Sequence, residues 1–338
     1  MSERPILEVT NLKKHFSARK SMFGEKTTVK AVDGVSFKVM PQESFAVVGE
    51  SGCGKTTLGK LVLALEKPTD GTVLFDGQDM AQMSGGAVRK LRREMQVIFQ
   101  DPYSSLNPRM TVEDIITEPW VIHGMHKDPA ERAKKLAKLL DDCGIAKTYL
   151  SRHPHEFSGG QRQRVGIARA LALDPRLVVA DEPVSALDVS IQAQILNLLK
   201  DLQKERKLAY LFISHDFSVV RHLCTRIAVM YLGRVVETAD SETLFNDPQH
   251  PYTEALLSAV PVPDPSIEKR RKRILLTGDV PSPLKPPSGC RFHPRCRYMV
   301  ESCRTDDPAL SEAKPGHLAA CPVRPFKDKC SEAALVSL

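Results

Sequence analysis

One stretch of the chain has the residue types and the spacing of a phosphate-binding loop. Residues 49–56 satisfy the pattern G-x-x-x-x-G-K-[ST], between the apolar run 44–48 and the helical pattern 57–65. Glycines let successive backbone N–H groups turn toward phosphate oxygens, the lysine can reach the β- and γ-phosphates, and the threonine hydroxyl can bind Mg²⁺. The start of the helix adds the positive end of its dipole. The predicted nucleotide-binding residues are Gly49, Glu50, Ser51, Gly52, Cys53, Gly54, Lys55, Thr56 and Thr57.

A pair of acids at the end of an apolar run is the second candidate for chemistry. Residues 177–180 are apolar and are followed by Asp181 and Glu182. A strand in this position would place Asp181 beside the phosphate loop, where it would hold Mg²⁺ directly or through water. Glu182 would then polarise an attacking water as a general base. A strand that happens to end in two surface acids would be the simpler interpretation. The phosphate loop in the same chain makes that simpler interpretation the weaker of the two.

The segment Ser158, Gly159, Gly160 and Gln161 distinguishes among the classes of phosphate-loop protein. A serine hydroxyl, exposed glycine N–H groups and the start of a helix form a second anion site, although a plain helix cap is also possible. With this segment the chain resembles the ATP-binding cassette (ABC) ATPases over roughly residues 6–261. In that family the segment binds the γ-phosphate of ATP held by the opposite subunit. The resemblance therefore implies two subunits that close on two ATP molecules, each bound by both subunits.

The same resemblance implies roles for four more residues. Gln100 corresponds to the glutamine that touches Mg²⁺ and the attacking water, and His215 to the histidine that contacts the γ-phosphate. Asp188 ends a segment, residues 185–188, that resembles the loop crossing the dimer interface, and Phe16 occupies the place of an aromatic that stacks on adenine. The implied cofactors are ATP and Mg²⁺. The implied magnesium ligands are Thr56, Gln100 and Asp181.

The framework for these residues is predicted from the alternation of apolar runs and helical patterns. Strands spaced by helices over residues 6–260 predict an α/β fold with a mostly parallel core sheet. The resemblance implies a P-loop NTPase cassette with an antiparallel β subdomain and a helical subdomain at about 104–160. The nucleotide-binding domain is then residues 1–260. Seven prolines in 261–287 and the basic run 269–273 predict a linker. Residues 288–338 form a small Cys-rich C-terminal region, which is too short and polar to fold without a cross-link such as a bound metal or cluster.

Composition and charge exclude several other classes of protein. Of the 338 residues, 42% are hydrophobic and 26% are charged, which is typical of a globular chain and not of a disordered or fibrous one. No run approaches the roughly 18 apolar residues of a membrane span, and residues 1–10 lack the pattern of a secretory signal, so we expect a cytoplasmic chain. A net charge of +7 does not favour a dedicated nucleic-acid binder.

Cysteines concentrate in the C-terminal region. Four of them are separated by five, six and seventeen residues, and a proline follows the last. Thiols in a cytoplasmic chain stay reduced, so a metal or a cluster explains them better than disulfides do. The spacing lacks the C-x₂₋₄-C of structural zinc, whereas a final Cys-Pro is compatible with a [4Fe–4S] cluster. Zinc, four buried thiols without a ligand, and replacement of one ligand by His293 or His317 stay open. The predicted cluster ligands are Cys290, Cys296, Cys303 and Cys321.

Residues 101–109 and 250–257 resemble segments of the dipeptide and oligopeptide importers, and the Cys-rich region belongs to the same subgroup. This resemblance, which also favours the cluster, implies the ATP-hydrolysing subunit of a bacterial peptide importer at the cytoplasmic face of the inner membrane. The implied partners are a second, homologous ATPase in a heterodimer, two transmembrane permease subunits and an extracytoplasmic peptide-binding protein, with no nucleic acid. The alternatives are import of nickel, glutathione or another small solute, export, a ribosome-associated cassette protein, and a DNA-maintenance ATPase, which would need a long coiled coil that the sequence lacks.

Overall fold

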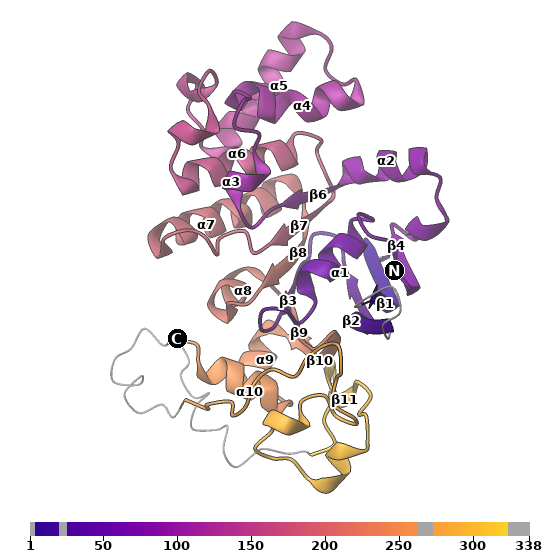
Figure 1. Ribbon diagram of the computed structural model, residues 1–338. Helices are drawn as coiled ribbons and strands as arrows, with labels where there is room; N and C mark the ends of the chain where they lie inside the picture. Colours follow the sequence, from indigo (N-terminus) through magenta and orange to yellow (C-terminus); the bar gives the residue numbers. More distant parts are fainter. Residues whose placement is uncertain (1–3, 20–25, 262–272, 324–338) are drawn as a thin grey trace. The chain divides into compact units, whose positions relative to one another are not determined.

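The computed structural model describes residues 4–19, 26–261 and 273–323, which form two compact units (Figure 1). Of the described residues, the first unit comprises 4–6, 39–43 and 82–213. The second comprises 7–19, 26–38, 44–81, 214–261 and 273–323. The chain passes between the units several times, so each unit collects segments that are distant in the sequence. The domain boundaries expected near residues 260 and 287 stay predictions.

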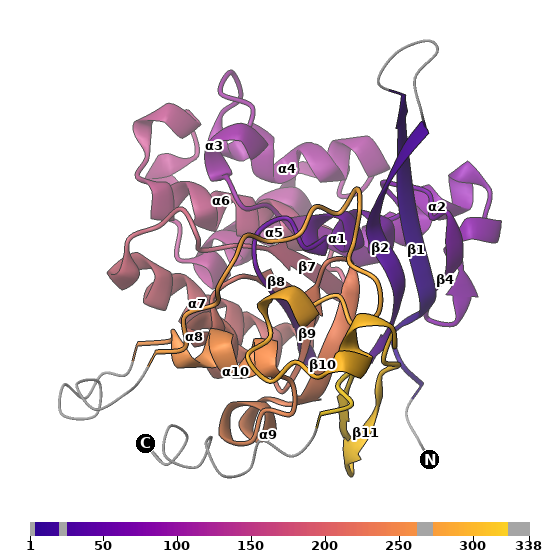
Figure 2. The same cartoon turned by 60° about the horizontal axis from the view of Figure 1, so that its bottom comes forward.

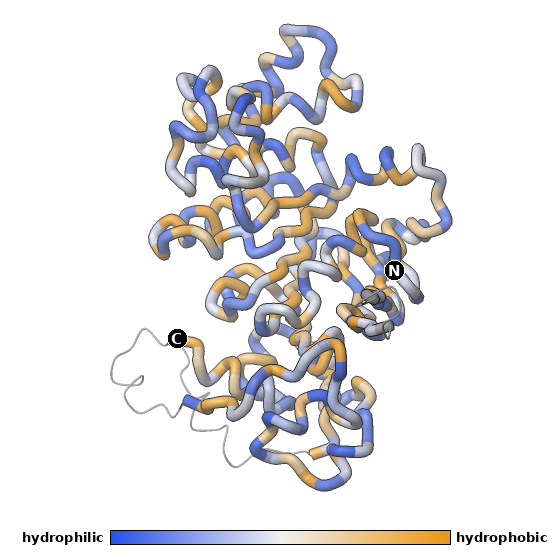
Figure 3. The backbone as a smooth tube through the Cα atoms, in the orientation of Figure 1, coloured by the Kyte–Doolittle hydropathy of each residue, from blue (hydrophilic) through white to orange (hydrophobic). Residues whose placement is uncertain are grey.

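The first unit contains parallel strands in the order β6 (Met95–Ile98), β7 (Leu177–Asp181) and β8 (Ala209–Ser214). The register pairs Ile98 with Ala180, and Asp181 with Ile213. Residues 177–180 are buried on both faces of the sheet, which is why β7 is a continuous apolar run instead of an alternating one. Such runs are orange along the tube of Figure 3.

The first unit also contains six helices among its described residues. They are α2 (Gly85–Glu94), α3 (Pro102–Ser105), α4 (Val112–His123), α5 (Pro129–Cys143), α6 (Gly159–Leu171) and α7 (Val189–Arg206). Between Gln100 and Ser158, a stretch that is described throughout, there are helices and 3₁₀ turns and no strand. The local sequence explains where these helices begin and end. Thr111 and Asp114 form a capping box at the start of α4, Pro129 begins α5, and glycines in the left-handed conformation follow both helices.

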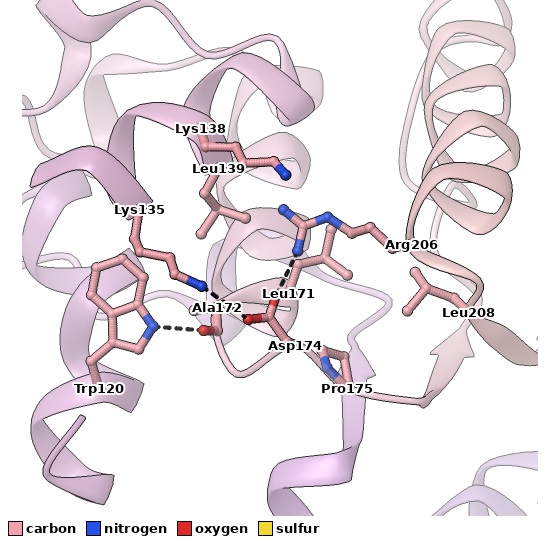
Figure 4. Close-up of a pocket in the computed structure, with 10 residues that line it drawn as sticks. All are labelled: Trp120, Lys135, Lys138, Leu139, Leu171, Ala172, Asp174, Pro175, Arg206 and Leu208. Atoms are coloured by element: carbon pink, nitrogen blue, oxygen red, sulfur yellow. Dashed lines mark hydrogen bonds and ion pairs between the residues drawn. The ribbon is translucent and has the colours of Figure 1, made fainter. Parts of the chain in front are cut away.

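The indole of Trp120 anchors α4 in the first unit. Its Nε1 donates a hydrogen bond to the carbonyl oxygen of Ala172 at 2.6 Å, and the side chain is buried. Trp120 lines a cavity of about 220 Å³, where Lys135 and Arg206 reach Asp174 at 3.8 and 2.9 Å (Figure 4). These contacts hold α4 and α5 against the residues that directly follow α6.

The second unit has two sheets. In one, β3 (Ser44–Val48) pairs in parallel with β9 (Arg226–Tyr231), which pairs antiparallel with β10 (Arg234–Asp240). In the other, β2 (Lys26–Val39), β1 (Leu7–Arg19), β4 (Asp70–Phe75) and β5 (Gln78–Asp79) follow in that order, and Figure 2 shows β1 and β2 as long neighbouring strands. The helices of this unit are α1 (Lys55–Val62), α8 (Phe217–Leu223), α9 (Ser241–Asn246) and α10 (Pro251–Ser258). The expected α/β cassette, with parallel core strands, an antiparallel β sheet and helices, is confirmed.

The C-terminal region is held by strand pairing with the second unit. β11 (Ser311–Lys314) and β12 (His317–Ala319) form a hairpin, and β12 pairs antiparallel with β10, with Glu237 opposite Ala319. The other described residues between 288 and 323 are irregular apart from 3₁₀ turns at His293–Arg295 and Glu301–Arg304. The region adds strands to an existing sheet. Strand pairing therefore holds it in place, and the expectation that it needs a metal or cluster for this purpose does not hold. Among the described residues, no helix is long and apolar enough to cross a membrane.

Candidate functional site

The phosphate loop lies between the buried strand β3 and the first turn of α1, in the second unit. Lys55 is 5% exposed, and its Nζ donates hydrogen bonds to the carbonyl oxygens of Gly49 at 2.7 Å and of Glu50 at 3.0 Å. The lysine side chain therefore lies along the loop that precedes it. Thr56 is exposed at the start of α1, where its hydroxyl oxygen suits Mg²⁺.

Two glycines of the loop are required by close packing. A Cβ atom on Gly49 would lie 2.2 Å from the carbonyl oxygen of Met230, and one on Gly54 would lie 2.0 Å from that of Ala31. Gly54 also has φ of 109°, in the left-handed region. Cys53 is buried within the loop, and burial raises the pKa of its thiol. The loop conformation thus depends on the neighbouring strands β2 and β9 of the same unit.

The two acids and the glutamine lie together in the first unit. Asp181 ends β7, and Glu182 follows with φ of 48°, a left-handed conformation that is strained for glutamate by roughly 1 kcal/mol or more. The Glu182 N–H donates to the Ile213 carbonyl at 2.8 Å. The Gln100 side-chain amide donates to Glu182 Oε2 at 2.9 Å. A strained backbone at a residue whose side chain can act in catalysis is typical of a functional position. The sequence pattern gave no indication of this strain.

Ser158 and Gln161 form a reciprocal cap at the start of α6. The Gln161 N–H donates to Ser158 Oγ at 3.4 Å, and the Ser158 N–H donates to Gln161 Oε1 at 2.9 Å. A Cβ atom on Gly160 would lie 2.4 Å from Cγ2 of Ile191, so a small residue here lets α7 approach. Asp188, exposed at the start of α7, makes no capping hydrogen bond. The segment is a helix cap by geometry, and its exposed serine stays available to a ligand.

The remaining predicted ATP-site residues belong to the second unit. Phe16 is 40% exposed on β1, and Lys14 Nζ lies 4.9 Å from the centre of its ring. An exposed aromatic on a strand suits stacking on a base better than a core position would. His215 is exposed directly after β8. The structure thus brings Gln100 and Glu182 into contact, and it places the phosphate loop, Phe16 and His215 in the other unit.

Cys290, Cys296, Cys303 and Cys321 form no disulfide within the described residues. The Cys290 N–H donates to the Cys303 carbonyl at 3.0 Å, which brings these two residues side by side. Burial raises the pKa of Cys290, and it raises the pKa of Cys296 to about 11. Throughout the described ranges, no group of three or more His, Cys, Asp or Glu side chains is arranged to hold a metal ion. As placed, these residues do not fit a metal centre, and the predicted [4Fe–4S] cluster or zinc finds no support in the structure.

Two residues that sequence reasoning did not connect to the phosphate loop lie against it. Tyr252 and Arg295, from α10 and the following C-terminal region, both contact Glu50. The only signal in the sequence was the segment 250–257, which pointed to a subgroup of proteins and not to a position in space.

Comparisons with known proteins match both parts of the chain. Residues 32–185 match the ABC transporter family model, and residues 236–303 match the model described as "Oligopeptide/dipeptide transporter, C-terminal region". The putative oligopeptide transport ATP-binding protein YkfD of Bacillus subtilis is 53% identical over 95% of this chain and 96% of its own length. The dipeptide transport ATP-binding protein DppF of Haemophilus influenzae is 48% identical over 94% of this chain and 96% of its own.

Solved structures agree with these matches at the level of the cassette. The structure of cbiO1 from Clostridium perfringens, part of the ABC transporter complex cbiONQ, has a TM-score of 0.62 and 29% identity, covering 72% of this chain and 91% of that one. The dimeric post-hydrolysis structure of the cassette MJ0796, bound to ADP and phosphate, has a TM-score of 0.62 and 28% identity, covering 70% of this chain and 98% of that one.

Proposed function

This chain belongs to the ABC transporter family, and from that premise we propose that it hydrolyses ATP to drive the import of oligopeptides or dipeptides through separate membrane subunits. The observation that carries the proposal is the phosphate loop between β3 and α1, in a chain whose residues 236–303 match the C-terminal region of peptide transporters. Relatives named for peptide and dipeptide transport cover nearly the whole chain. This similarity disfavours a DNA-maintenance ATPase.

ATP binds the loop residues 49–57, with Lys55 on the β- and γ-phosphates and Phe16 on the adenine. The proposed magnesium ligands are Thr56, Gln100 and Asp181, whose oxygen atoms are the kind that Mg²⁺ prefers. The ion neutralises phosphate charge when it is bound. Lys55 orients the phosphates, and His215 holds the γ-phosphate during hydrolysis.

Glu182 is the proposed general base. Its hydrogen bond from Gln100 at 2.9 Å supports this role because it orients the carboxylate, and its strained backbone supports it because such strain is typical of functional positions. Replacement by Gln keeps the size of the side chain and removes its basicity. We expect Glu182→Gln to retain ATP binding and to lower the rate of phosphate release by about 100-fold or more.

The matched control for this variant is Glu205→Gln, the same chemical change at an exposed position of α7. Both purified chains are assayed for phosphate release and for binding of a fluorescent ATP analogue. Undiminished phosphate release from Glu182→Gln would remove Glu182 from the role of base.

The proposed active form is a pair of ATPases, each contributing its phosphate loop to one ATP and its Ser158–Gln161 segment to the other. Asp188 lies at the interface of this pair. The exposed start of α6 supports the arrangement, because it offers a hydroxyl and the positive end of a helix to a phosphate. A second, homologous ATPase is the proposed partner. A Ser158→Arg variant that still binds ATP alone but no longer pairs in its presence would support this arrangement, and unchanged pairing would contradict it.

Two permease subunits and an extracytoplasmic peptide-binding protein complete the proposed importer at the cytoplasmic face of the inner membrane. Reconstitution of the chain with its permeases in vesicles tests the solute. ATP-dependent uptake of labelled dipeptide or oligopeptide is expected. Uptake of nickel or glutathione in place of peptide would assign the same machinery to another solute.

The C-terminal cysteines add a separate hypothesis, which rests on sequence spacing alone. Four thiols followed by a proline are compatible with a [4Fe–4S] cluster, with zinc as the alternative. Anaerobic purification followed by iron, sulfide and zinc assays decides between them. A colourless chain without iron would end the cluster hypothesis, and the absence of zinc as well would leave four structural thiols.

A further inference from the structure

Glu50, the second residue of the phosphate loop, forms a two-pronged ion pair with Arg295 of the C-terminal region. Arg295 Nη1 donates to Glu50 Oε2 at 2.7 Å, and Nη2 donates to Oε1 at 3.1 Å. The arginine side chain is 7% exposed and the glutamate 27%. The paired hydrogen bonds of a planar guanidinium on a carboxylate combine charge with a fixed orientation. Both residues belong to the second unit, so this contact is internal to it.

The backbone of Glu50 is held from the same side. Its N–H donates to the hydroxyl of Tyr252 at 2.9 Å. Tyr252 is fully buried, with its ring centre 4.7 Å from that of Tyr231 and 5.4 Å from that of Phe292. Burial, with a smaller contribution from the Glu50 carboxylate, raises the pKa of Tyr252, so its hydroxyl stays neutral. Glu50 is therefore bound through its main chain by a residue 202 positions further along the chain, and through its side chain by one 245 positions further along.

Arg295 is presented by a rigid segment. It ends the 3₁₀ turn His293–Arg295, and its N–H donates to the carbonyl of the buried Phe292 at 3.0 Å. Two residues before this turn, the Arg291 side chain hydrogen-bonds the Leu232 carbonyl and the Asp33 carboxylate. An arginine that is fixed in this way loses little freedom when it pairs with Glu50.

The charges of the loop explain what this pair does. Residues 49–56 carry one basic side chain, Lys55, and one acidic side chain, Glu50. A carboxylate in a loop that binds a triphosphate repels the ligand, and in a partly buried site this repulsion is weakly screened. Pairing with Arg295 neutralises the carboxylate and directs it toward the C-terminal region, so Lys55 sets the sign of the loop's charge.

We propose that Arg295 is a positioning residue for nucleotide binding, through which the C-terminal region neutralises Glu50 and keeps the phosphate loop receptive to ATP. The inference rests on the proposed binding of ATP to this loop. It gives the C-terminal region a direct part in the ATPase reaction. Arg295 touches no reacting atom, so its loss affects the binding of ATP more than the chemical step.

The test compares four forms of the full-length chain: wild type, Arg295→Gln, Glu50→Gln and the double variant. Binding of a fluorescent ATP analogue is measured by titration at low and at moderate salt, and circular dichroism verifies folding. We expect Arg295→Gln to weaken binding on the order of tenfold, and more at low salt, because an unpaired carboxylate now faces the phosphates. The double variant binds more tightly than Arg295→Gln, since it carries neither charge. Glu50→Gln alone binds the analogue more tightly than wild type, because the positive charge of Arg295 is then left beside the phosphates. Equal or weaker binding by Glu50→Gln would contradict the inference, which keeps the test decisive if Arg295→Gln does not fold.

Arg297→Gln is the matched control. Arg297 also pairs with a glutamate, Glu254, at 2.8 Å in the same region, but neither residue belongs to the phosphate loop. The Arg297→Gln variant is expected to bind the ATP analogue with the affinity of the wild type. In steady-state ATPase assays, KM of Arg295→Gln rises about as much as its dissociation constant, while kcat changes less than about twofold.

Two further results would overturn the inference while leaving the proposed function intact. One is unchanged binding by Arg295→Gln, and the other is a double variant as weak as Arg295→Gln, which would show a purely structural role. A wild-type chain without measurable ATP binding would instead overturn the proposed function, and the inference with it.

Discussion

Replacing Asp33 by Asn is expected to destabilise the second unit in a pH-dependent manner. Asp33 is 8% exposed, and the side chains of one histidine and two arginines converge on its carboxylate. His15 Nε2 lies 2.9 Å from Oδ1, Arg234 Nη2 lies 3.4 Å from Oδ2, and Arg291 forms an ion pair with Oδ2. The pairs join β1, β2 and β10 to the C-terminal region. Asn keeps the shape of the side chain and removes the carboxylate that pairs directly with the buried Arg291.

The magnitude follows from the pKa of Asp33. Burial by itself would raise this pKa, but hydrogen bonds from His15 and Arg291 and the charges of Arg291 and Arg234 lower it from 3.8 to about 2. A shift of about two units corresponds to roughly 2.5 kcal/mol of folding free energy. We reduce this to about 1–2 kcal/mol, because the network borders a cavity of about 460 Å³ that admits solvent. The substitution also leaves the buried guanidinium of Arg291 without the carboxylate of Asp33, which adds to this loss. The unfolding free energy of Asp33→Asn is therefore expected to be lower by about 3 kcal/mol at neutral pH.

The sign of the pH dependence follows from the lowered pKa. Because the folded state holds its proton less tightly than the unfolded chain, the stabilisation is fully present above about pH 4. It is lost as the pH falls from about 4 toward 2, where the folded carboxyl is protonated as well. Asp33→Asn has no carboxyl group to protonate at this position, so it does not show this loss of stability in acid. The unfolding free energies of wild type and variant therefore converge at low pH.

Denaturant unfolding followed by circular dichroism between about pH 7 and pH 2 measures both effects, and hydrogen exchange localises them. The Asp33 N–H, which donates to the Gly233 carbonyl at 2.8 Å, is expected to lose protection in the variant. Asp70→Asn is the matched control, because Asp70 pairs with Lys13 at 2.8 Å but its side chain is 59% exposed. The reasoning is refuted if Asp33→Asn is as stable as Asp70→Asn at pH 7, or if it keeps the full wild-type loss of stability below pH 4.

Two further variants test other parts of the structure. Gly49→Ala places a Cβ atom 2.2 Å from the Met230 carbonyl oxygen, so the loop shifts and titration with an ATP analogue shows at least about tenfold weaker binding. Gly166→Ala, with open space around a helical position, is expected to bind normally, and equal binding by both variants would contradict the packing argument. Glu237→Ala removes a fully buried carboxylate that accepts hydrogen bonds from two backbone N–H groups and from His317 Nε2 at 2.6 Å. Denaturant unfolding is expected to show a loss of about 3–5 kcal/mol with early proteolysis near β12, and a loss below about 1 kcal/mol would show that the carboxylate is dispensable.

The helical segment shows how far local patterns reach. Thr111 and Pro129 stand where α4 and α5 begin, and Gly124 and Gly144 follow their ends. Caps and helix breakers act within one turn, so the sequence indicates such boundaries directly. The same holds for residues 49–56, because a strand, glycines and a lysine at fixed spacing define a phosphate loop wherever they occur.

The C-terminal region shows where local patterns fail. Its polar composition and its cysteines suggested a small unit that needs a metal staple. The structure instead pairs β12 with β10 and buries Glu237 against His317, 80 positions away. Backbone pairing with a distant strand leaves no signal in a single sequence, because almost any residue with the right alternation can take part.

By itself, the sequence determined the ATP-binding motifs and the peptide-transporter subgroup, since each rests on residue types within a few positions of one another. It also determined the α/β cassette, through the alternation of apolar runs and helical patterns. Only the tertiary structure decided that Glu182 has a left-handed backbone beside Gln100, and that Arg295 neutralises Glu50 across 245 positions. Local motifs are specified by backbone geometry over one turn or one strand. Charge pairing depends on which surfaces the folded chain brings within a few ångströms, and that is a property of the whole fold.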